Sequence, residues 1–212
     1  MHKLLLHPAY FGPVSQYAAM IKAEKVVFEN EDNYQKQTYR NRMYIYGANG
    51  KLSLNVPIRH TGNKSNHQKY RDVRIENDFP WQKQHWRSLE TVYRTSPFFE
   101  FYEDDFKPLY DENFEFLIDF NYKCFELAQE SLQVEINFEK TTEYFLNPEG
   151  MVNGRSLINA KNSKPVIIEP YTQVFQEKFG FLNDLSIVDL LFNEGPNAIN
   201  YLKNQKVLLP DP

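Results

Sequence analysis

Residues 3–28 of this chain, KLLLHPAYFGPVSQYAAMIKAEKVVF, carry the pattern that indicates the fold class. The apolar run at residues 3–6 is too short for a helix and predicts a buried strand. Pro13 suits the first turn of a helix because its φ is fixed and its missing N–H is not needed there. Apolar residues then recur at helical spacing as far as Ile21, and a second apolar run at residues 26–28 predicts another strand. This order predicts a βαβ-like unit with a right-handed connection.

A β-hairpin is the next clear local structure. Alternating runs at residues 42–46 and 51–58 flank a turn that contains Asn49-Gly50, which is typical of a hairpin. Apolar residues then recur at helical spacing in three segments, which predicts helices at residues 80–93, 98–110 and 114–132.

The rest of the chain predicts short β-like segments and two C-terminal helices. β structure is expected at residues 73–75, 133–146 and 165–168, with a loop at 147–164. Ser186 begins a possible capping box, and Pro196 suits a second helix start. We therefore expect an α/β fold with a mixed sheet, a βαβ-like N-terminal unit, a β-hairpin, and helical middle and C-terminal portions. Residues 1–212 are expected to form a single domain with a helical insertion around residues 80–132.

The net charge, the length of apolar runs and the cysteine count each argue against a class of protein. The 212 residues include 24 basic and 28 acidic side chains, a formal net charge of -4, which disfavours nucleic-acid binding. No apolar run approaches the ~20 residues that span a bilayer, so no membrane insertion is expected. The single cysteine, Cys124, excludes an internal disulfide framework. We expect a cytoplasmic protein, and a homo-oligomer is compatible with this composition.

His7 is the first candidate site residue because it directly follows the first predicted strand. Ligands of open α/β sheets collect beyond the carboxyl ends of the strands. An imidazole there can transfer a proton near neutral pH or contact a phosphate oxygen. The alternative is an ordinary hydrogen-bonding residue of a turn.

The segment at residues 29–42 begins at the end of the second predicted strand and is rich in charge. Its carboxylates, Glu29, Glu31 and Asp32, offer a general base or a divalent-metal ligand. Its cations, Lys36, Arg40 and Arg42, offer contacts to a carboxylate or phosphate. The alternative is a solvated loop whose charges pair with one another.

His85 lies one helical turn from Trp81 and Leu89, so it faces the apolar side of its helix. It is either a core histidine or a catalytic or ligand-binding one, with Trp86 beside it as a stacking platform for a sugar or base. A buried imidazole without a partner is costly, which keeps both interpretations open.

The basic segment at residues 59–71 contains His60 and His67 but no acidic residue. A mobile, solvated connection is expected, and the alternative is a loop that closes over a phosphorylated ligand. No third ligand at a recognisable spacing accompanies the two histidines, so no metal site is expected. The sequence does not name a cofactor.

Four blocks of sequence, spread over nearly the whole chain, resemble the WbqC-like family. They read YQKQTYRNR at residues 34–42, LNVPI at 54–58, WQKQHW at 81–86 leading into SPFF at 96–99, and LSIVDLLFNEGP at 185–196. Many relatives have Gln-Pro-x-Tyr where this chain has His7-Pro8-Ala9-Tyr10, and paired aspartates where it has Asn30-Glu31. The resemblance implies a cytoplasmic function near activated-sugar metabolism, because the family is linked to surface-polysaccharide (O-antigen) loci. It implies no particular reaction.

The leading hypothesis is a group-transfer enzyme acting on a nucleotide-activated or phosphorylated sugar-like substrate. The catalytic candidates are His7, His85 and Glu31, with Glu31 orienting an imidazole. The substrate-binding candidates are Tyr10, Tyr34, Lys36, Asn41, Arg42 and Trp86. The expected partner is a small molecule, an anionic sugar or nucleotide.

The rival hypothesis is a non-catalytic binding or assembly protein of the same pathway. Its aromatic side chains would dock a partner chain, and an exposed apolar patch would favour it. Binding of structured RNA is a third hypothesis, which the acidic net charge disfavours.

Overall fold

The computed structural model describes residues 3–59, 68–161 and 166–207. Its main sheet has four parallel strands, in the order β5 (Phe138–Lys140), β2 (Lys25–Phe28), β1 (Lys3–Leu6) and β6 (Met151–Asn153). Leu4 of β1 lies opposite Val26 on one side and Val152 on the other. The two central strands are apolar because parallel sheets are usually covered on both faces.

The N-terminal βαβ unit is confirmed. Helix α1 (Val14–Lys22) connects β1 to β2, which pairs with it in parallel. Phe28 of β2 packs against Phe125 of α4 (Leu117–Ser131), with ring centroids 5.0 Å apart. Helix α4 therefore covers part of one face of the sheet.

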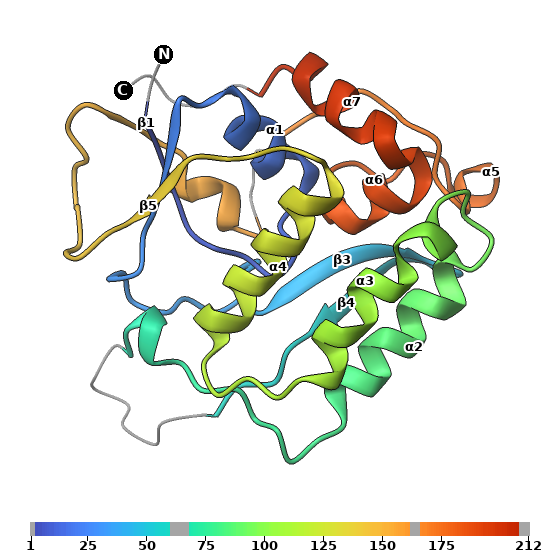
Figure 1. Ribbon diagram of the computed structural model, residues 1–212, viewed down its shortest axis with the longest axis horizontal. Coiled ribbons are helices and arrows are strands. Elements are labelled where there is room, and N and C mark those ends of the chain that lie inside the picture. The colour runs from blue at the N-terminus through green and yellow to red at the C-terminus, as the bar shows by residue number, and fades with distance from the viewer. Residues whose placement is uncertain (1–2, 60–67, 162–165, 208–212) are drawn as a thin grey trace.

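The predicted hairpin is also confirmed, as a separate antiparallel pair of β3 (Arg42–Gly47) and β4 (Gly50–Asn55). Gly50 has a φ of 99°, a conformation that favours glycine in such a turn. The α/β class is confirmed, with the parallel and antiparallel pairs in two different sheets. Figure 1 shows the hairpin between the parallel sheet on one side and α2 (Trp81–Tyr93) and α3 (Phe99–Asp111) on the other.

The predicted C-terminal helices are present. Ser186 caps α6 (Ile187–Glu194), and its hydroxyl accepts a hydrogen bond from the backbone N–H of Val188. Pro196 lies in the short 3₁₀ helix η3 (Gly195–Asn197), which leads into α7 (Ala198–Asn204). A single turn, α5 (Gln176–Phe179), precedes them.

Several β predictions are wrong. Residues 73–75 form isolated bridges from Arg74 and Ile75, next to the 3₁₀ helix η1 (Tyr70–Asp72). Only Phe138–Lys140 forms a strand within 133–146. Residues 166–168 are irregular, and Pro165 lies outside the described residues. Of the predicted mobile loop at 59–71, residues 60–67 also lie outside them.

The expected loop at 147–164 contains β6 and the 3₁₀ helix η2 (Arg155–Ile158) instead. A Cβ atom at Gly154 would lie 2.7 Å from a methyl group of Leu6 and 2.9 Å from one of Leu4. A glycine is therefore needed for the chain to pass this close to β1. With only three residues, β6 is too short to give a periodic signal.

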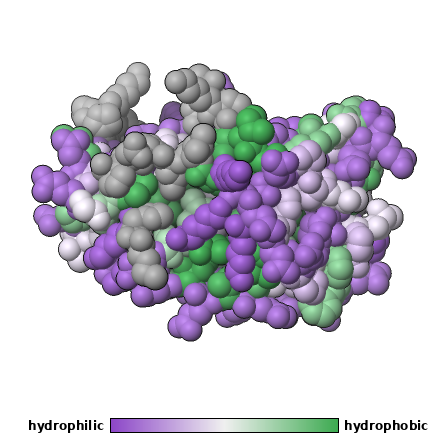
Figure 2. Space-filling model, turned by 90° about the horizontal axis from the view of Figure 1, so that it is seen from above, coloured by the Kyte–Doolittle hydropathy of each residue, from purple (hydrophilic) through white to green (hydrophobic). Residues whose placement is uncertain are grey.

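Aromatic rings make up a large share of the core, together with aliphatic side chains. Fully buried examples are Phe11, Phe28, Phe99, Phe106, Phe120 and Phe125. On the face seen in Figure 2, hydrophilic side chains break up the apolar patches. The high aromatic content therefore serves the core to a large extent.

Candidate active site

The site lies at the topological switch point of the parallel sheet. From β1 the chain turns to β2 on one side, whereas β6 lies on the other side of β1. Ligands of open α/β sheets bind beyond the carboxyl ends of the strands at such a point. His7 directly follows β1, and Arg155 follows β6 after Gly154. Two side chains with acid–base or anion-binding chemistry thus meet at this edge.

Three buried side chains form the centre of the site. His7 Nε2 lies 2.9 Å from Asp32 Oδ2 and 2.8 Å from Arg40 Nη2, and Arg40 Nη2 donates to Asp32 Oδ2 at 3.0 Å. Arg40 has no exposed surface, and its guanidinium lies 5.2 Å from the ring centroid of Tyr70. A fully buried arginine is rare unless it is paired, and this one pairs with a carboxylate beside an imidazole.

Electrostatics keep His7 neutral. Burial, and then the charge of Arg40, lower the pKa of His7 to about 4. Burial alone would raise the pKa of the Asp32 carboxyl, but the hydrogen bond from His7 and the charge of Arg40 outweigh burial and lower it. At neutral pH the cluster therefore holds a neutral imidazole, a carboxylate and a guanidinium.

The position of the proton on His7 decides which neighbour its ring serves. A carboxylate only accepts hydrogen bonds and a guanidinium only donates them. With the proton on Nε2, His7 donates to Asp32 and leaves Nδ1 free to take a proton. With the proton on Nδ1, Nε2 accepts from Arg40. Two neutral tautomers with different partners suit an imidazole that accepts and releases protons.

A cavity of about 180 Å³ adjoins this cluster and is lined by His7, Asp32, Gln35, Arg40, Tyr144, Arg155, Ser156, Ile158 and Asn159. The guanidinium of Arg155 is held by the carbonyl of Phe145 at 2.7 Å and by Asn153 Oδ1 at 2.9 Å. Its Nη1 lies 3.9 Å from the carboxylate of Glu29, which is fully buried. Two arginines on one small cavity favour an anionic ligand.

A larger, more open cleft of about 670 Å³ brings together four of the predicted substrate-binding residues, Tyr34, Lys36, Asn41 and Arg42. Asn41 is oriented by the bond from its Nδ2 to the carbonyl of Val56 at 3.0 Å. Gln35 lines the small cavity, while its neighbours Tyr34 and Lys36 line the cleft. The segment at residues 34–36 therefore borders both spaces.

The other predicted site residues lie elsewhere. Tyr10 and His85 are buried together, with the Tyr10 hydroxyl 3.0 Å from His85 Nδ1, and burial lowers the pKa of His85 to about 4. Trp86 packs against Phe99 and Tyr110 in the helical core. Tyr10, His85 and Trp86 are all absent from the walls of the cavity and of the cleft in the described structure.

Within residues 3–59, 68–161 and 166–207, Glu31 forms no hydrogen bond or ion pair with an imidazole. Its carboxylate pairs with Lys69 at 3.2 Å and with Arg71. The carboxylate that contacts a histidine belongs to the next residue, Asp32. The expected contact thus exists with a different partner.

The described residues contain no group of three or more His, Cys, Asp or Glu side chains arranged to hold a metal ion. None of the helices in these ranges has the length and apolar character needed to cross a membrane.

The model of the WbqC-like protein family matches residues 8–159. The chain belongs to this family. The matched range contains Asp32, Arg40 and Arg155, and His7 directly precedes it. An uncharacterized protein of Mycobacterium tuberculosis (strain ATCC 25618 / H37Rv), Rv1507c, is 25% identical over 230 aligned positions that cover 96% of this chain and 98% of the relative. No solved structure matches the chain.

The structure adds one site residue to this WbqC-like protein that the sequence analysis missed. Arg155 was overlooked because β6 was interpreted as loop, so nothing placed residue 155 at the edge of the sheet. The available signal was the glycine at 154, directly before an arginine. Asp32 and Arg40 are recognisable in the sequence as charged residues of a loop. Their contact with His7 is not, because residues so far apart in the sequence meet only in the folded chain.

Proposed function

We propose that this WbqC-like protein is a group-transfer enzyme for a nucleotide-activated or phosphorylated sugar-like substrate in surface-polysaccharide (O-antigen-type) biosynthesis. The carrying observation is the contact of a neutral His7 with Asp32 and Arg40 beside a cavity at the switch point. The polysaccharide context rests on the family alone. We place this activity in the cytoplasm, where activated sugars are made.

In this proposal, His7 is the general base for a hydroxyl or amine acceptor. The acceptor oxygen or nitrogen forms the new bond to the transferred group and loses its proton to the imidazole. The bond from that group to the phosphate breaks, and the phosphate leaves with the electron pair. Asp32 orients the imidazole and stabilises its charged form, while Arg40 and Arg155 stabilise the leaving phosphate.

The adjoining cleft supports binding of the rest of the donor. Lys36 and Arg42 supply positive charge there, and Asn41 can pair with a hydroxyl or carbonyl group. Tyr144 lines the small cavity, is 44% exposed, and lies under the Arg155 guanidinium at 5.4 Å. A sugar or base ring that spans the two spaces would have an aromatic surface to pack on.

A thermal-shift panel tests the proposal, with nucleotides, nucleotide sugars and acyl-CoAs added to the purified protein. A ligand at 100 times its Kd stabilises the fold by about 2.7 kcal/mol. We expect an activated sugar to raise the Tm of the wild type and to lose this effect in Arg42→Ala and Arg155→Gln. The exposed Arg87→Ala is the matched control and should retain the shift.

Product formation is then measured with the stabilising donor and a set of amine and hydroxyl acceptors. His7→Gln should bind the donor and lose turnover. A flat panel with well-folded protein would overturn the enzyme proposal and favour the assembly role. A shift that survives in both arginine variants would overturn the assignment of the site.

A further inference from the structure

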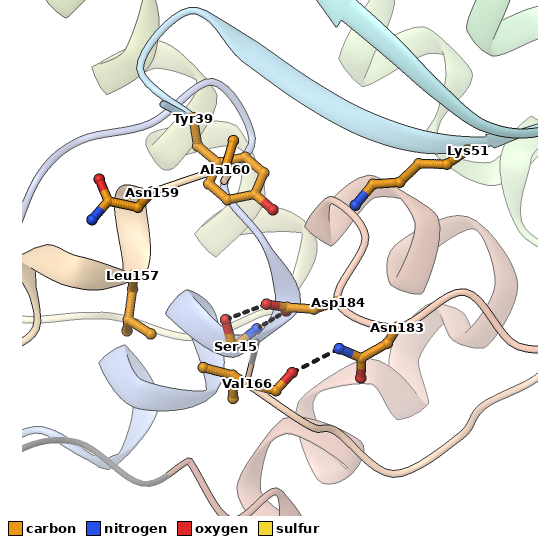
Figure 3. Close-up of a pocket in the computed structure, with 9 residues that line it drawn as sticks. All are labelled: Ser15, Tyr39, Lys51, Leu157, Asn159, Ala160, Val166, Asn183 and Asp184. Carbon is orange, nitrogen blue, oxygen red and sulfur yellow. Dashed lines mark hydrogen bonds between the residues drawn. The ribbon is translucent and has the colours of Figure 1, made fainter. Parts of the chain in front are cut away.

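A second cavity, of about 190 Å³, lies beside the start of α1 (Figure 3). Its walls come from α1, from β4, from the end of η2 and from the loop before α6, and are formed by Ser15, Tyr39, Lys51, Leu157, Asn159, Ala160, Val166, Asn183 and Asp184. Asn159 also lines the cavity of the candidate active site. The two spaces therefore lie on either side of one short segment.

Asp184 is held in place firmly. Its φ of 55° lies in the left-handed region, which is sparsely populated by residues other than glycine and persists only where surroundings impose it. Its carboxylate accepts hydrogen bonds from the backbone N–H and the hydroxyl of Ser15, both at 2.8 Å. A carboxylate has about four lone-pair sites, so it retains capacity for further donors. Burial raises the pKa of Asp184 to about 6, and the two hydrogen bonds from Ser15 and then the charge of Lys51 only partly oppose this increase.

Lys51 supplies a positive charge on the wall of the cavity across from Asp184. Figure 3 shows the Lys51 ammonium and the Tyr39 hydroxyl both directed toward the space that Asp184 borders. The Lys51 Nζ atom lies 4.1 Å from the ring centroid of Tyr44. The ammonium thus rests on an aromatic face and is separated from the carboxylate of Asp184 by the cavity.

The side chain of Asn183, another polar residue of the cavity wall, already has hydrogen-bond partners within the protein. Asn183 Nδ2 donates to the carbonyl of Val166 at 2.7 Å, and its Oδ1 accepts from the backbone N–H of Ile168 at 3.1 Å. These bonds hold the loop that carries Asp184. Among the described residues that line the space, the charged side chains are Lys51 and Asp184, with the Tyr39 hydroxyl as a further donor or acceptor.

We propose that this cavity binds a small zwitterion, whose ammonium group contacts Asp184 and whose carboxylate contacts Lys51. A simple anion would meet the carboxylate of Asp184, and a simple cation would meet the ammonium of Lys51. A ligand with both charges satisfies both side chains. The volume is below the roughly 300–1,000 Å³ typical of drug-sized pockets, which fits a molecule the size of a small amino acid. This inference is independent of the group-transfer proposal.

Isothermal titration calorimetry on the 212-residue chain tests this proposal, with three probes that share a four-carbon chain. γ-Aminobutyrate carries both charges, n-butylamine only the ammonium and butyrate only the carboxylate. Glycine and β-alanine vary the distance between the charges. We expect at least one zwitterion to bind with a Kd at least tenfold below that of both singly charged probes.

Substitutions place the binding in the cavity. Lys51→Gln and Asp184→Asn should each raise the Kd of the zwitterion at least tenfold, whereas the exposed Asp105→Asn should leave it unchanged. If Asp184→Asn does not fold, the exposed Lys51→Gln and the probe comparison still decide the question. Equal binding of all probes, no binding of any zwitterion, or an unchanged Kd in Lys51→Gln would overturn the proposal.

Discussion

Two histidines, His7 and His85, share their burial and a lowered pKa but differ in their surroundings. Both side chains are almost inaccessible, and burial lowers the pKa of each to about 4. His7 contacts Asp32 and Arg40 and lines a cavity. His85 contacts the hydroxyl of Tyr10 and the edge of Trp81 within the helical core.

The comparison shows that a shifted histidine pKa does not identify a site. Desolvation lowers the pKa wherever the ring is buried. Two features distinguish a reactive imidazole from a core imidazole: charged side chains in contact with the ring, and a cavity beside it. Three experiments test this distinction, in order of decreasing expected effect.

The largest effect is expected from Arg40→Met. The substitution leaves the carboxylate of Asp32 without its buried cation, which should lower the free energy of unfolding by about 3–5 kcal/mol. Arg94→Met, which breaks an exposed pair with Glu103, is the control and should change stability little. Urea unfolding measures both. Equal losses in the two variants would mean that the buried cluster near His7 is no more coupled than a surface pair.

An intermediate effect is expected from placing leucine at each histidine. His85→Leu removes a partner of the buried Tyr10 hydroxyl and should cost about 1–3 kcal/mol of stability, with any donor-induced Tm shift retained. His7→Leu leaves the Asp32–Arg40 pair in place, so its loss of stability should be smaller, but turnover should disappear. The opposite pattern in the same urea and turnover assays would reverse the assignment of site and core.

The smallest effect is expected from pH in the wild type. The folded-state pKa values of both histidines are lowered to about 4, so their contribution to stability is lost as pH falls from about 6.5 to 4. Burial raises the folded-state pKa values of Asp184 and of Asp189, a buried residue of α6, to about 6, so their contribution to stability grows as pH falls from about 6 to 4. The two pairs offset each other, and we expect these four groups to change stability by less than about 1 kcal/mol between pH 6 and 4.

His85→Leu exposes this offset. Because the variant lacks the contribution of His85, its free energy of unfolding should rise relative to that of the wild type by roughly 2 kcal/mol as pH falls from 6 to 4. Urea unfolding at several pH values in this range compares the variant with the wild type. Parallel profiles of the two proteins would show that His85 does not change protonation on unfolding.

The sequence predicts the parts of this molecule that depend on local pattern. The βαβ unit follows from two short apolar runs around a helix start at Pro13, and the hairpin follows from alternation around Asn49-Gly50. The cap at Ser186 is equally local. All three involve neighbouring residues, so periodicity and turn chemistry suffice.

The parts that depend on distant contacts are not predicted. β6 has three residues and becomes a strand only because β1 offers it a free edge. Because β6 is not predicted, neither Arg155 nor the other residues after β6 that line the active-site cavity are predicted. The predicted partner of an imidazole, Glu31, is one residue away from the observed partner, Asp32, because adjacent carboxylates cannot be distinguished until the backbone after β2 is known.

The position of β6 beside β1 also has a consequence for how the protein is made. Lys3 pairs with Met151, so the central strand obtains its second neighbour only after α2, α3 and α4 have been synthesised. Until then a growing chain carries an apolar strand with one open edge, which can pair with other chains. Contacts so distant in sequence form slowly because a long loop must close first. The strand arrangement that assembles the site thus also makes the nascent protein dependent on a strand that is translated more than 140 residues after β1.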